Sequence, residues 1–323
     1  MMRKSRSLAV KNGKRAAKVA SIAILLACAF LFSGKPAVAA STGGIRPGGG
    51  YWLGSPDGGV FSFGVSFYGS ATGDRAVCHL TTPNGSCWSM AAAPVGSGYW
   101  ILNADTGTIH AYGSLPSYGQ PADTPTYEAS PEFRPRAVQI VATRDGKGYW
   151  VLELGLSGLG TVQAFGDAGF FGDETTISHS LGHQGSPVAL IGSADDQGYW
   201  IVDNDGGVFS FGGARFFGSM ADRHLTGPVL TAAATNDGQG YWLASSDGGV
   251  FAFGDAAFSG SLASVPLGGP VISMAADRSG TGYWLAATDG GVFAFGGAPF
   301  LGSMSARPLD RPISTIVSAA PTT

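Results

Sequence analysis

Residues 282–304 read GYWLAATDGGVFAFGGAPFLGSM, and five earlier stretches of the chain repeat this phrase with changes. The intervals between the tyrosines of successive Gly-Tyr-Trp triplets are 48, 50, 50, 42 and 42 residues. A period of this length is typical of repeat architectures, in which each repeat is one supersecondary unit. The six tyrosines are Tyr51, Tyr99, Tyr149, Tyr199, Tyr241 and Tyr283.

Each repeat contains four short strand-like runs, separated by joints rich in Gly, Asp and Asn. In the last repeat the runs are residues 270–276, 283–287, 292–295 and 299–303. Glycine accepts the positive φ of a tight hairpin, and an Asp carboxylate can cap the turn. We therefore predict four-stranded sheets. Their second and third strands are joined by Asp-Gly-Gly at Asp57, Asp205, Asp247 and Asp289.

The adjacent Tyr and Trp of each repeat point to opposite faces of a strand, so both are buried only if the sheet is covered on both faces. A radial stack of sheets meets this demand. The first repeat lacks its first strand, and residues 312–318 form a first strand with nothing after it. We therefore predict an all-β fold, a six-bladed β-propeller of four-stranded blades. The C-terminal strand would close the ring by one-plus-three closure, in a single domain of residues 48–323.

The N-terminus has the features of an export signal. Residues 1–18 are basic without an acid, residues 21–32 are apolar, and residues 37–39 read Ala-Val-Ala. We predict that residues 1–39 are a cleaved signal peptide and that residues 40–47 are a short linker. The alternatives are an uncleaved anchor and lipidation at Cys28.

The predicted mature chain is acidic. Residues 1–39 hold eight of the 19 basic residues and none of the 22 acidic ones, which leaves a net charge of -11. This charge opposes nonspecific nucleic-acid binding and favours solubility outside the cell. We therefore expect a secreted monomer with no nucleic-acid partner and no transmembrane span after cleavage.

Two cysteines remain after cleavage, Cys78 and Cys87. In an exported chain two cysteines most simply form one disulfide, and we predict that bond here. The alternative, a pair of metal ligands, lacks the spacing of a zinc site. A calcium site in residues 203–206 would lack the later ligands of a calcium-binding loop. We therefore predict no metal and no cofactor.

Long connections follow the first three repeats, at residues 70–86, 120–135 and 173–185. In a propeller these connections share one face with the turns between second and third strands. Loops on a rigid scaffold are the usual place for function, although drift in unconstrained loops is the alternative. His179 and His183 could bind a metal or could simply be solvated. Arg134 and Glu132 could form a local ion pair. The predicted ligand-binding residues are Tyr127, Glu132, Arg134, Asp173, Glu174, His179 and His183.

The predicted inner strands carry a mildly polar ring, which is suited to bound water and unsuited to acid–base chemistry. No paired carboxylates and no Ser/His/Asp set recur where the repeats would bring them together, so we predict no catalytic residue. The equivalent positions are Ser89, Gln139, Leu190, Thr231, Ser273 and Thr315.

Residues 48–318 resemble the GYW…DGGVFAFG…FxGS tandem repeats of exported actinobacterial proteins. The resemblance implies a β-propeller and export, and such repeats sometimes accompany cell-wall hydrolases. It is weaker in the second and third repeats, which have other residues in place of Asp-Gly-Gly. The resemblance implies no catalytic residue for this chain.

We therefore predict a secreted, noncatalytic interaction propeller that recognises a protein or a cell-envelope glycan through loops on one face. One alternative is a carbohydrate-active hydrolase or lyase that uses residues of those loops. Another is a structural component of the envelope.

Overall fold

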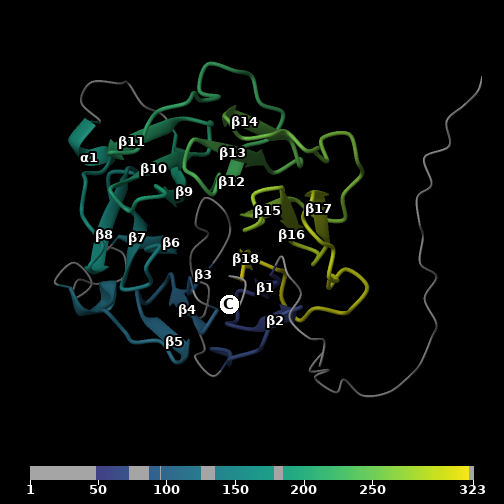
Figure 1. Cartoon of the computed structure of the whole chain (residues 1–323), viewed down its shortest axis with the longest axis horizontal. Helices are drawn as coiled ribbons and strands as arrows, with labels where there is room; N and C mark the ends of the chain where they lie inside the picture. Colours follow the sequence, from purple (N-terminus) through teal and green to yellow (C-terminus); the bar gives the residue numbers. More distant parts are fainter. Residues whose placement is uncertain (1–48, 73–86, 95, 125–134, 178–184, 320–323) are drawn as a thin grey trace, which may run out of the picture. The chain divides into compact units, whose positions relative to one another are not determined.

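A computed structural model of the chain describes residues 49–72, 87–94, 96–124, 135–177 and 185–319. Within these ranges the chain forms six antiparallel sheets of three strands each, together with two short helical segments (Figure 1). The helical segments are the 3-10 turn η1 (Pro121–Asp123) and α1 (Glu174–Ile177). The protein is therefore almost entirely β, as the sequence predicts.

We number the sheets by their Gly-Tyr-Trp strand, which is always the middle one. Sheet 1 is β18-β1-β2, sheet 2 is β3-β4-β5, sheet 3 is β6-β7-β8, sheet 4 is β9-β10-β11, sheet 5 is β12-β13-β14 and sheet 6 is β15-β16-β17. The strands are β1 (Tyr51–Gly54), β2 (Val60–Phe63), β3 (Trp88–Ala92), β4 (Gly98–Asn103), β5 (Ile109–Gly113), β6 (Arg136–Ala142), β7 (Gly148–Leu154), β8 (Gly160–Gly166), β9 (Pro187–Gly192), β10 (Gly198–Asp203), β11 (Val208–Gly212), β12 (Val229–Ala234), β13 (Gly240–Ser245), β14 (Val250–Gly254), β15 (Val271–Ala276), β16 (Gly282–Ala287), β17 (Val292–Gly296) and β18 (Thr315–Ser318).

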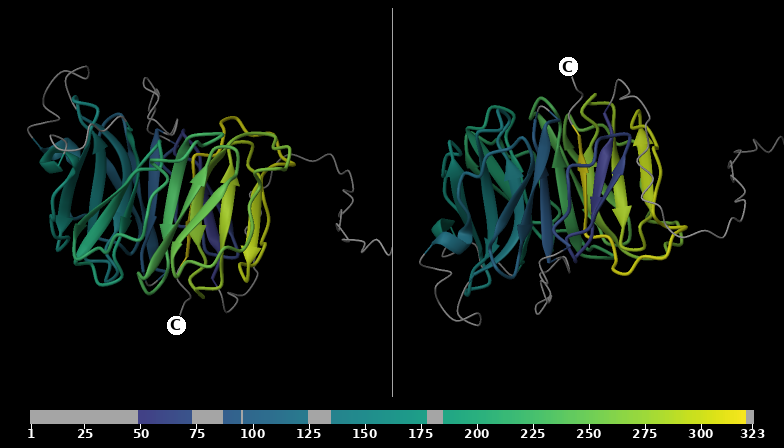
Figure 2. Two further views of the ribbon diagram at one scale, coloured as in Figure 1. Left: turned by 90° about the horizontal axis from the view of Figure 1, so that it is seen from above. Right: turned by 90° about the horizontal axis from the view of Figure 1, so that it is seen from below.

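Sheet 1 combines strands that are far apart in the sequence. β18 pairs antiparallel with β1, and the register places Tyr51 opposite Ser318 and Gly54 opposite Thr315. The first strands of the sheets also contact one another in the order β18, β3, β6, β9, β12, β15, and β15 contacts β18 again. Figure 2 shows that the strands of all sheets run between the same two ends of this unit. We call the end with the turns between second and third strands the loop end.

Polar side chains on the first strands join neighbouring sheets. Ser89 Oγ of sheet 2 accepts a hydrogen bond from the Ile140 amide of sheet 3 (3.1 Å). The Thr231 and Ser273 hydroxyls of sheets 5 and 6 accept equivalent bonds from the first strand of the next sheet, each at 3.1 Å. These members of the predicted polar ring therefore accept hydrogen bonds from backbone amides of the next sheet.

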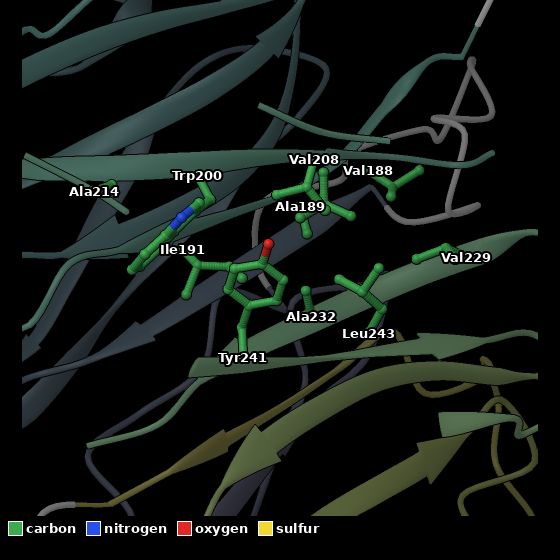
Figure 3. Packing of buried hydrophobic residues seen from close by; sticks show 11 residues of the cluster. Val188, Ala189, Ile191, Trp200, Val208, Ala214, Val229, Ala232, Tyr241 and Leu243 are labelled. Carbon is green, nitrogen blue, oxygen red and sulfur yellow. The ribbon is translucent and has the colours of Figure 1, made fainter. Parts of the chain in front are cut away.

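The Tyr and Trp of each Gly-Tyr-Trp triplet pack between sheets, one on each face of their own sheet. In Figure 3 the Trp200 indole of β10 lies beside the Tyr241 ring of β13, and the ring centroids are 5.5 Å apart. The same Trp-to-Tyr contact joins every sheet to the next, including Trp284 of sheet 6 to Tyr51 of sheet 1 at 5.3 Å. Both rings are buried in every repeat, which confirms the prediction that each sheet is covered on both faces.

The predicted fourth strand is wrong, because each described sheet has three strands. In the last repeat the backbone of residues 299–303 is held by side chains. Trp284 Nε1 of the same repeat donates to the Pro299 carbonyl (2.8 Å), and the Tyr51 hydroxyl of sheet 1 donates to the Gly302 carbonyl (2.6 Å). The Leu301 amide donates to the same hydroxyl (3.2 Å). These bonds engage backbone groups that the ladder of a fourth strand would otherwise use.

Every repeat uses the same arrangement, so each tyrosine hydroxyl joins its own sheet to the preceding repeat. The carbonyl acceptors are Gly69, Gly119, Gly172, Gly218, Gly260 and Gly302. Burial raises the pKa of Tyr51, Tyr99 and Tyr199 to about 12, so these hydroxyls remain protonated donors at neutral pH.

The Asp-Gly-Gly turns have the predicted chemistry. In sheet 5 the Asp247 carboxylate accepts a hydrogen bond from the Gly249 amide (3.1 Å), and Gly248 has a φ of 83°. The other three turns of this sequence repeat the carboxylate-to-amide bond and the positive φ. These acids are therefore part of the turns, as the sequence predicts.

Candidate functional site

Most of the predicted ligand-binding residues lie outside the described part of the chain. These residues are Tyr127, Glu132, Arg134, His179 and His183, and Cys78 also lies outside it. Cys87 is described and is 1% exposed. The predicted disulfide and the ligand roles of the undescribed residues stay predictions.

Asp173 and Glu174 are described, and they begin the connection between β8 and β9. Asp173 stabilises the first turn of α1, because its carboxylate accepts hydrogen bonds from the Thr175 amide (3.1 Å) and hydroxyl (2.5 Å). The Thr176 hydroxyl also donates to the Asp173 carbonyl (2.6 Å). Asp173 is therefore a cap residue, and the turn that it fixes directs the next side chain inward.

Glu174 is buried between sheets 3 and 4, with 1% of its surface exposed. Its Oε2 accepts a hydrogen bond from the Gly160 amide at the beginning of β8 (2.5 Å). A second carboxyl group meets it there, since Asp203 at the end of β10 is bonded to Glu174 through its side chain. Two carboxyl groups in one buried position cannot both ionise readily.

Burial favours the protonated form of Asp203. Desolvation raises the pKa of its carboxyl to about 9, and the nearby Glu174 and Asp205 carboxylates contribute to the same direction. At neutral pH the carboxyl pair therefore retains a proton, and the side chains of Asp203 and Glu174 are hydrogen-bonded through it. This bond ties the connection after sheet 3 to the Gly-Tyr-Trp strand of sheet 4.

Backbone closes over this carboxyl pair. A Cβ atom at Gly185 would lie 2.7 Å from Asp203 Oδ2 and 2.9 Å from Asp205 Oδ1. Asp203 has no exposed surface. A substrate therefore cannot reach these acids in this conformation, and the pair is suited to holding a loop rather than to transferring protons to a ligand.

At the position of Asp203, the other repeats have a neutral residue or, in sheet 3, a glutamate. Ser55 and Ser245 occupy the place of Asp203 in sheets 1 and 5, and each hydroxyl donates to the Asp of its own turn at 2.5 Å. Sheet 3 has Glu153 there, which is 2% exposed and accepts a hydrogen bond from Gln163 Nε2 (2.9 Å). Buried acids at this position are therefore confined to two neighbouring sheets, 3 and 4, within the described chain.

Sequence reasoning considered Asp203 only as part of a calcium site in residues 203–206 and did not connect it to Glu174. A signal was present, because an acid stands where the first and fifth repeats have serine. Within the described ranges, no group of three or more His, Cys, Asp or Glu side chains is arranged to hold a metal ion. In the same ranges, the structure has no helix of the length and hydrophobicity that a membrane crossing needs.

No protein-family model matches the chain, and no curated protein matches it either. Among solved structures, the chain is similar to one described as "Crystal Structure of Mitotic Checkpoint Complex", with 11% identity and a TM-score of 0.37. The similarity covers 67% of this chain and 64% of that chain, so it spans less than two thirds of the length of the matched protein.

Proposed function

We propose that the protein is a secreted, noncatalytic binding module that recognises a protein or a cell-envelope glycan through its loop end. The observation behind this proposal is that repeated and unrepeated residues have different roles. The side chains that recur in every repeat are engaged in joining the sheets. The residues that differ between repeats gather in the connections after sheets 1, 2 and 3, where a rigid scaffold would present them to a partner.

We also propose that the six sheets are the blades of a closed propeller, each with three strands and a side-chain-bound fourth segment. Three contacts between the chain ends support closure. These are the β1–β18 ladder, the hydrogen bond from Tyr51 to Gly302 and the packing of Trp284 on Tyr51. A closed ring would fix the positions of the strands between which these connections run.

Export is part of the proposal and rests on the sequence. Residues 1–39 have the order of a signal peptide, and the repeats resemble those of exported actinobacterial proteins. The buried position of Glu174 and Asp203 favours binding over hydrolysis at this end, since a hydrolase needs a carboxyl group that can contact its substrate.

The test is capture of partners from the producer's envelope and culture fluid by immobilised residues 40–323. The matched control replaces residues 125–134 and 173–184 with short connections like those after sheets 4 and 5. It also carries Asp203→Ser, the residue of sheets 1 and 5, because loss of Glu174 would otherwise leave Asp203 buried without that partner. Equal unfolding midpoints of the two proteins would establish that the scaffold is intact.

We expect a partner that the parent retains and the control does not. Treatment of the extract with a protease, or with periodate to destroy glycans, then identifies the chemical class of that partner. Equal retention by the two proteins would contradict recognition through these connections.

A further inference from the structure

Five of the six repeats expose a phenylalanine at the same position. The position lies in the fourth segment, the run after the third strand, two residues before the glycine whose carbonyl bonds the tyrosine of the next sheet. Single exposed apolar side chains are ordinary on a protein surface, but exposure of 54–61% at one position of five repeats is not scatter. The residues are Phe67, Phe170, Phe216, Phe258 and Phe300.

The backbone on both sides of each exposed ring is fixed by buried side chains. In the fifth repeat, Trp242 Nε1 donates a hydrogen bond to the Ala257 carbonyl (2.9 Å), just before Phe258. Just after Phe258, the Ser259 amide donates to the Tyr283 hydroxyl of sheet 6 (3.3 Å). Phe258 is therefore held between one bond to its own sheet and one bond to the next sheet, with its ring directed towards solvent.

The second repeat shows that the exposed ring is not needed for this arrangement. It has Ser117 at the position of the phenylalanines. Trp100 Nε1 nevertheless donates to the Pro116 carbonyl (2.9 Å), and the Tyr118 amide donates to the Tyr149 hydroxyl (3.2 Å). The fold therefore forms this junction with a serine, and the five phenylalanines are available for another role.

The exposed phenylalanines lie on the outer side of the sheets. The first strands contact one another, and Figure 1 shows the third strands, which the fourth segments follow, farthest from them. In the fifth repeat the segment begins where the Ala256 amide donates to the Phe253 carbonyl (3.4 Å). It reaches the loop end where the Leu262 amide donates to the Gly248 carbonyl (2.8 Å). Phe258 lies between these points and therefore away from the loop end.

The spacing of the rings limits what can contact several of them. Packed sheets are about 10 Å apart face to face, and each sheet except sheet 2 contributes one ring, so successive rings are separated by at least this distance. A single small molecule cannot contact two of them. The rings also do not form the continuous apolar patch that the core of a protein–protein interface needs. A polymer with repeating units can contact such separate platforms one after another.

The chemistry of a separate aromatic face fits a neutral sugar ring. The face of an aromatic ring is its negative part. In a β-1,4-linked pyranose of the glucose type, the hydroxyl groups and linkages lie around the ring edge. Its two faces therefore present only C–H groups, which are the positive partners of an aromatic face. The net charge of -11 for residues 40–323 opposes two other occupants, nucleic-acid bases and an anionic lipid surface.

We propose that these five exposed phenylalanines are contact points for a neutral β-1,4-linked polysaccharide, with one sugar ring stacked on each phenylalanine that the polymer reaches. Each contact is weak, but a second contact along the same polymer is intramolecular once the first has formed. The fixed segments reduce the cost of ordering on binding. These contact points lie on the side of the sheets and do not rest on the proposed recognition through the loop end.

Depletion of the purified protein from solution by suspended chitin and by cellulose tests the proposal. We expect saturable binding of the parent to at least one of these β-1,4-linked polymers. A variant with serine at all five positions, the residue of the second repeat, should bind at least about tenfold more weakly and melt at the parent temperature. Leu156→Ser, which removes an exposed apolar side chain outside the fourth segments, should leave binding unchanged.

Three results of this experiment would overturn the proposal. They are no binding of the parent to either polymer, unchanged binding of the five-serine variant, and equally tight binding of the parent to starch, whose glucose units are α-linked. A preference for chitin would indicate N-acetylated sugars, and a preference for cellulose would indicate unsubstituted ones. Both preferences support the proposal.

Ser117→Phe tests the same idea by gain and does not depend on the stability of the five-serine variant. It places a ring where the second repeat lacks one, in a segment that other repeats build with phenylalanine. The additional contact should strengthen binding to the polymer at least about twofold. Binding no tighter than that of the parent would contradict the proposal.

Three measurements separate the polysaccharide from other ligands and other sites. Sedimentation velocity should show a monomer for the parent and for the five-serine variant. A parent oligomer that the five serines dissociate would assign the rings to contacts between copies. Binding of the parent, but not of the variant, to phosphatidylcholine vesicles would assign them to a lipid surface. The protein with shortened connections that tests the proposed function should bind the polymer like the parent. Loss of polymer binding in that protein would place the site in the connections, and each of these contrary results would overturn the proposal.

Discussion

The junction between sheets 4 and 5 and the junction between sheets 3 and 4 both contain the Trp–Tyr contact, but they bury different additional polar groups. Between sheets 4 and 5, the Tyr241 hydroxyl bonds the Gly218 carbonyl (2.5 Å) and the Phe217 amide (3.2 Å), and this neutral set recurs in all six repeats. Between sheets 3 and 4, the carboxyl pair of Glu174 and Asp203 is added at the loop end. The repeated groups hold the sheets together, whereas the added acids hold one particular connection.

The largest effect should come from removing β18. Deletion of residues 312–323 takes the first strand from sheet 1 and exposes the edge of β1 and the apolar faces next to it. We expect cooperative thermal unfolding to be lost. Deletion of residues 320–323 alone, which keeps β18, should melt like the parent. A shorter protein that still melts cooperatively at the parent temperature would show that β18 is dispensable.

Glycine substitutions compare a repeated turn with an unrepeated one. Gly248→Ala in the Asp-Gly-Gly turn of sheet 5 forces a side chain into a φ of 83° and places its Cβ 2.5 Å from Leu262 Cβ. We expect a loss of about 2–5 kcal/mol from strain and overpacking. Gly158→Ala in the turn of sheet 3 has a φ of 84° and nothing within 4 Å of the new Cβ, so only about 1–2 kcal/mol should be lost. Urea unfolding measures both losses of stability. Equal losses would show that crowding around Gly248 does not add to the cost of a side chain there.

Removal of one tyrosine hydroxyl tests whether the two chain ends form an ordinary junction. Tyr241→Phe leaves the Gly218 carbonyl and the Phe217 amide without their partner, which should cost about 1–3 kcal/mol. Tyr51→Phe breaks the equivalent bonds between sheet 1 and the last repeat, and it should cost the same. Chemical denaturation compares the two variants. A negligible loss for Tyr51→Phe beside a clear loss for Tyr241→Phe would contradict equivalence of the junctions.

The smallest effect is the pH dependence that Asp203 contributes. Its pKa of about 9 in the folded protein exceeds the value of about 3.9 for an unperturbed Asp, so the folded state binds more protons between these pH values. The stability contributed by this group is therefore complete below about pH 4 and declines as the pH rises towards 9. Asp203→Asn cannot ionise, and between pH 7 and pH 8 it should lose less stability than the parent, by about 1 kcal/mol.

Urea unfolding at several pH values measures this difference. Asn is a suitable replacement because Asn103 occupies the equivalent position in sheet 2. Asp222→Asn, a change at an exposed acid, should leave the pH profile of the parent unaltered. Parallel profiles for Asp203→Asn and the parent would show that Asp203 does not hold the proton.

The features that were predictable from sequence depend on neighbours along the chain. The repeat period, the Asp-Gly-Gly turns and the opposite faces of Tyr and Trp all follow from local spacing. The fourth run of each repeat was predicted as a strand because its composition suits one. Its hydrogen bonds instead go to a Trp of the same repeat and a Tyr of the next, and no local pattern contains that information.

The contacts of the candidate site could not be predicted from the sequence for the same reason. Glu174 was predicted as a ligand-binding residue, but its partner Asp203 lies 29 residues further along the chain. Departures from the repeat were nevertheless visible. An acid stands at Asp203 where two other repeats have serine.

Hydrogen–deuterium exchange of the parent protein tests most directly whether the two ends of the described chain complete one scaffold. β1 and β18 form a ladder, so their bonded amides should exchange as slowly as those of β13, the middle strand of sheet 5. Amides of β1 and β18 that exchange at the rate of an unstructured peptide, while β13 stays protected, would contradict the account.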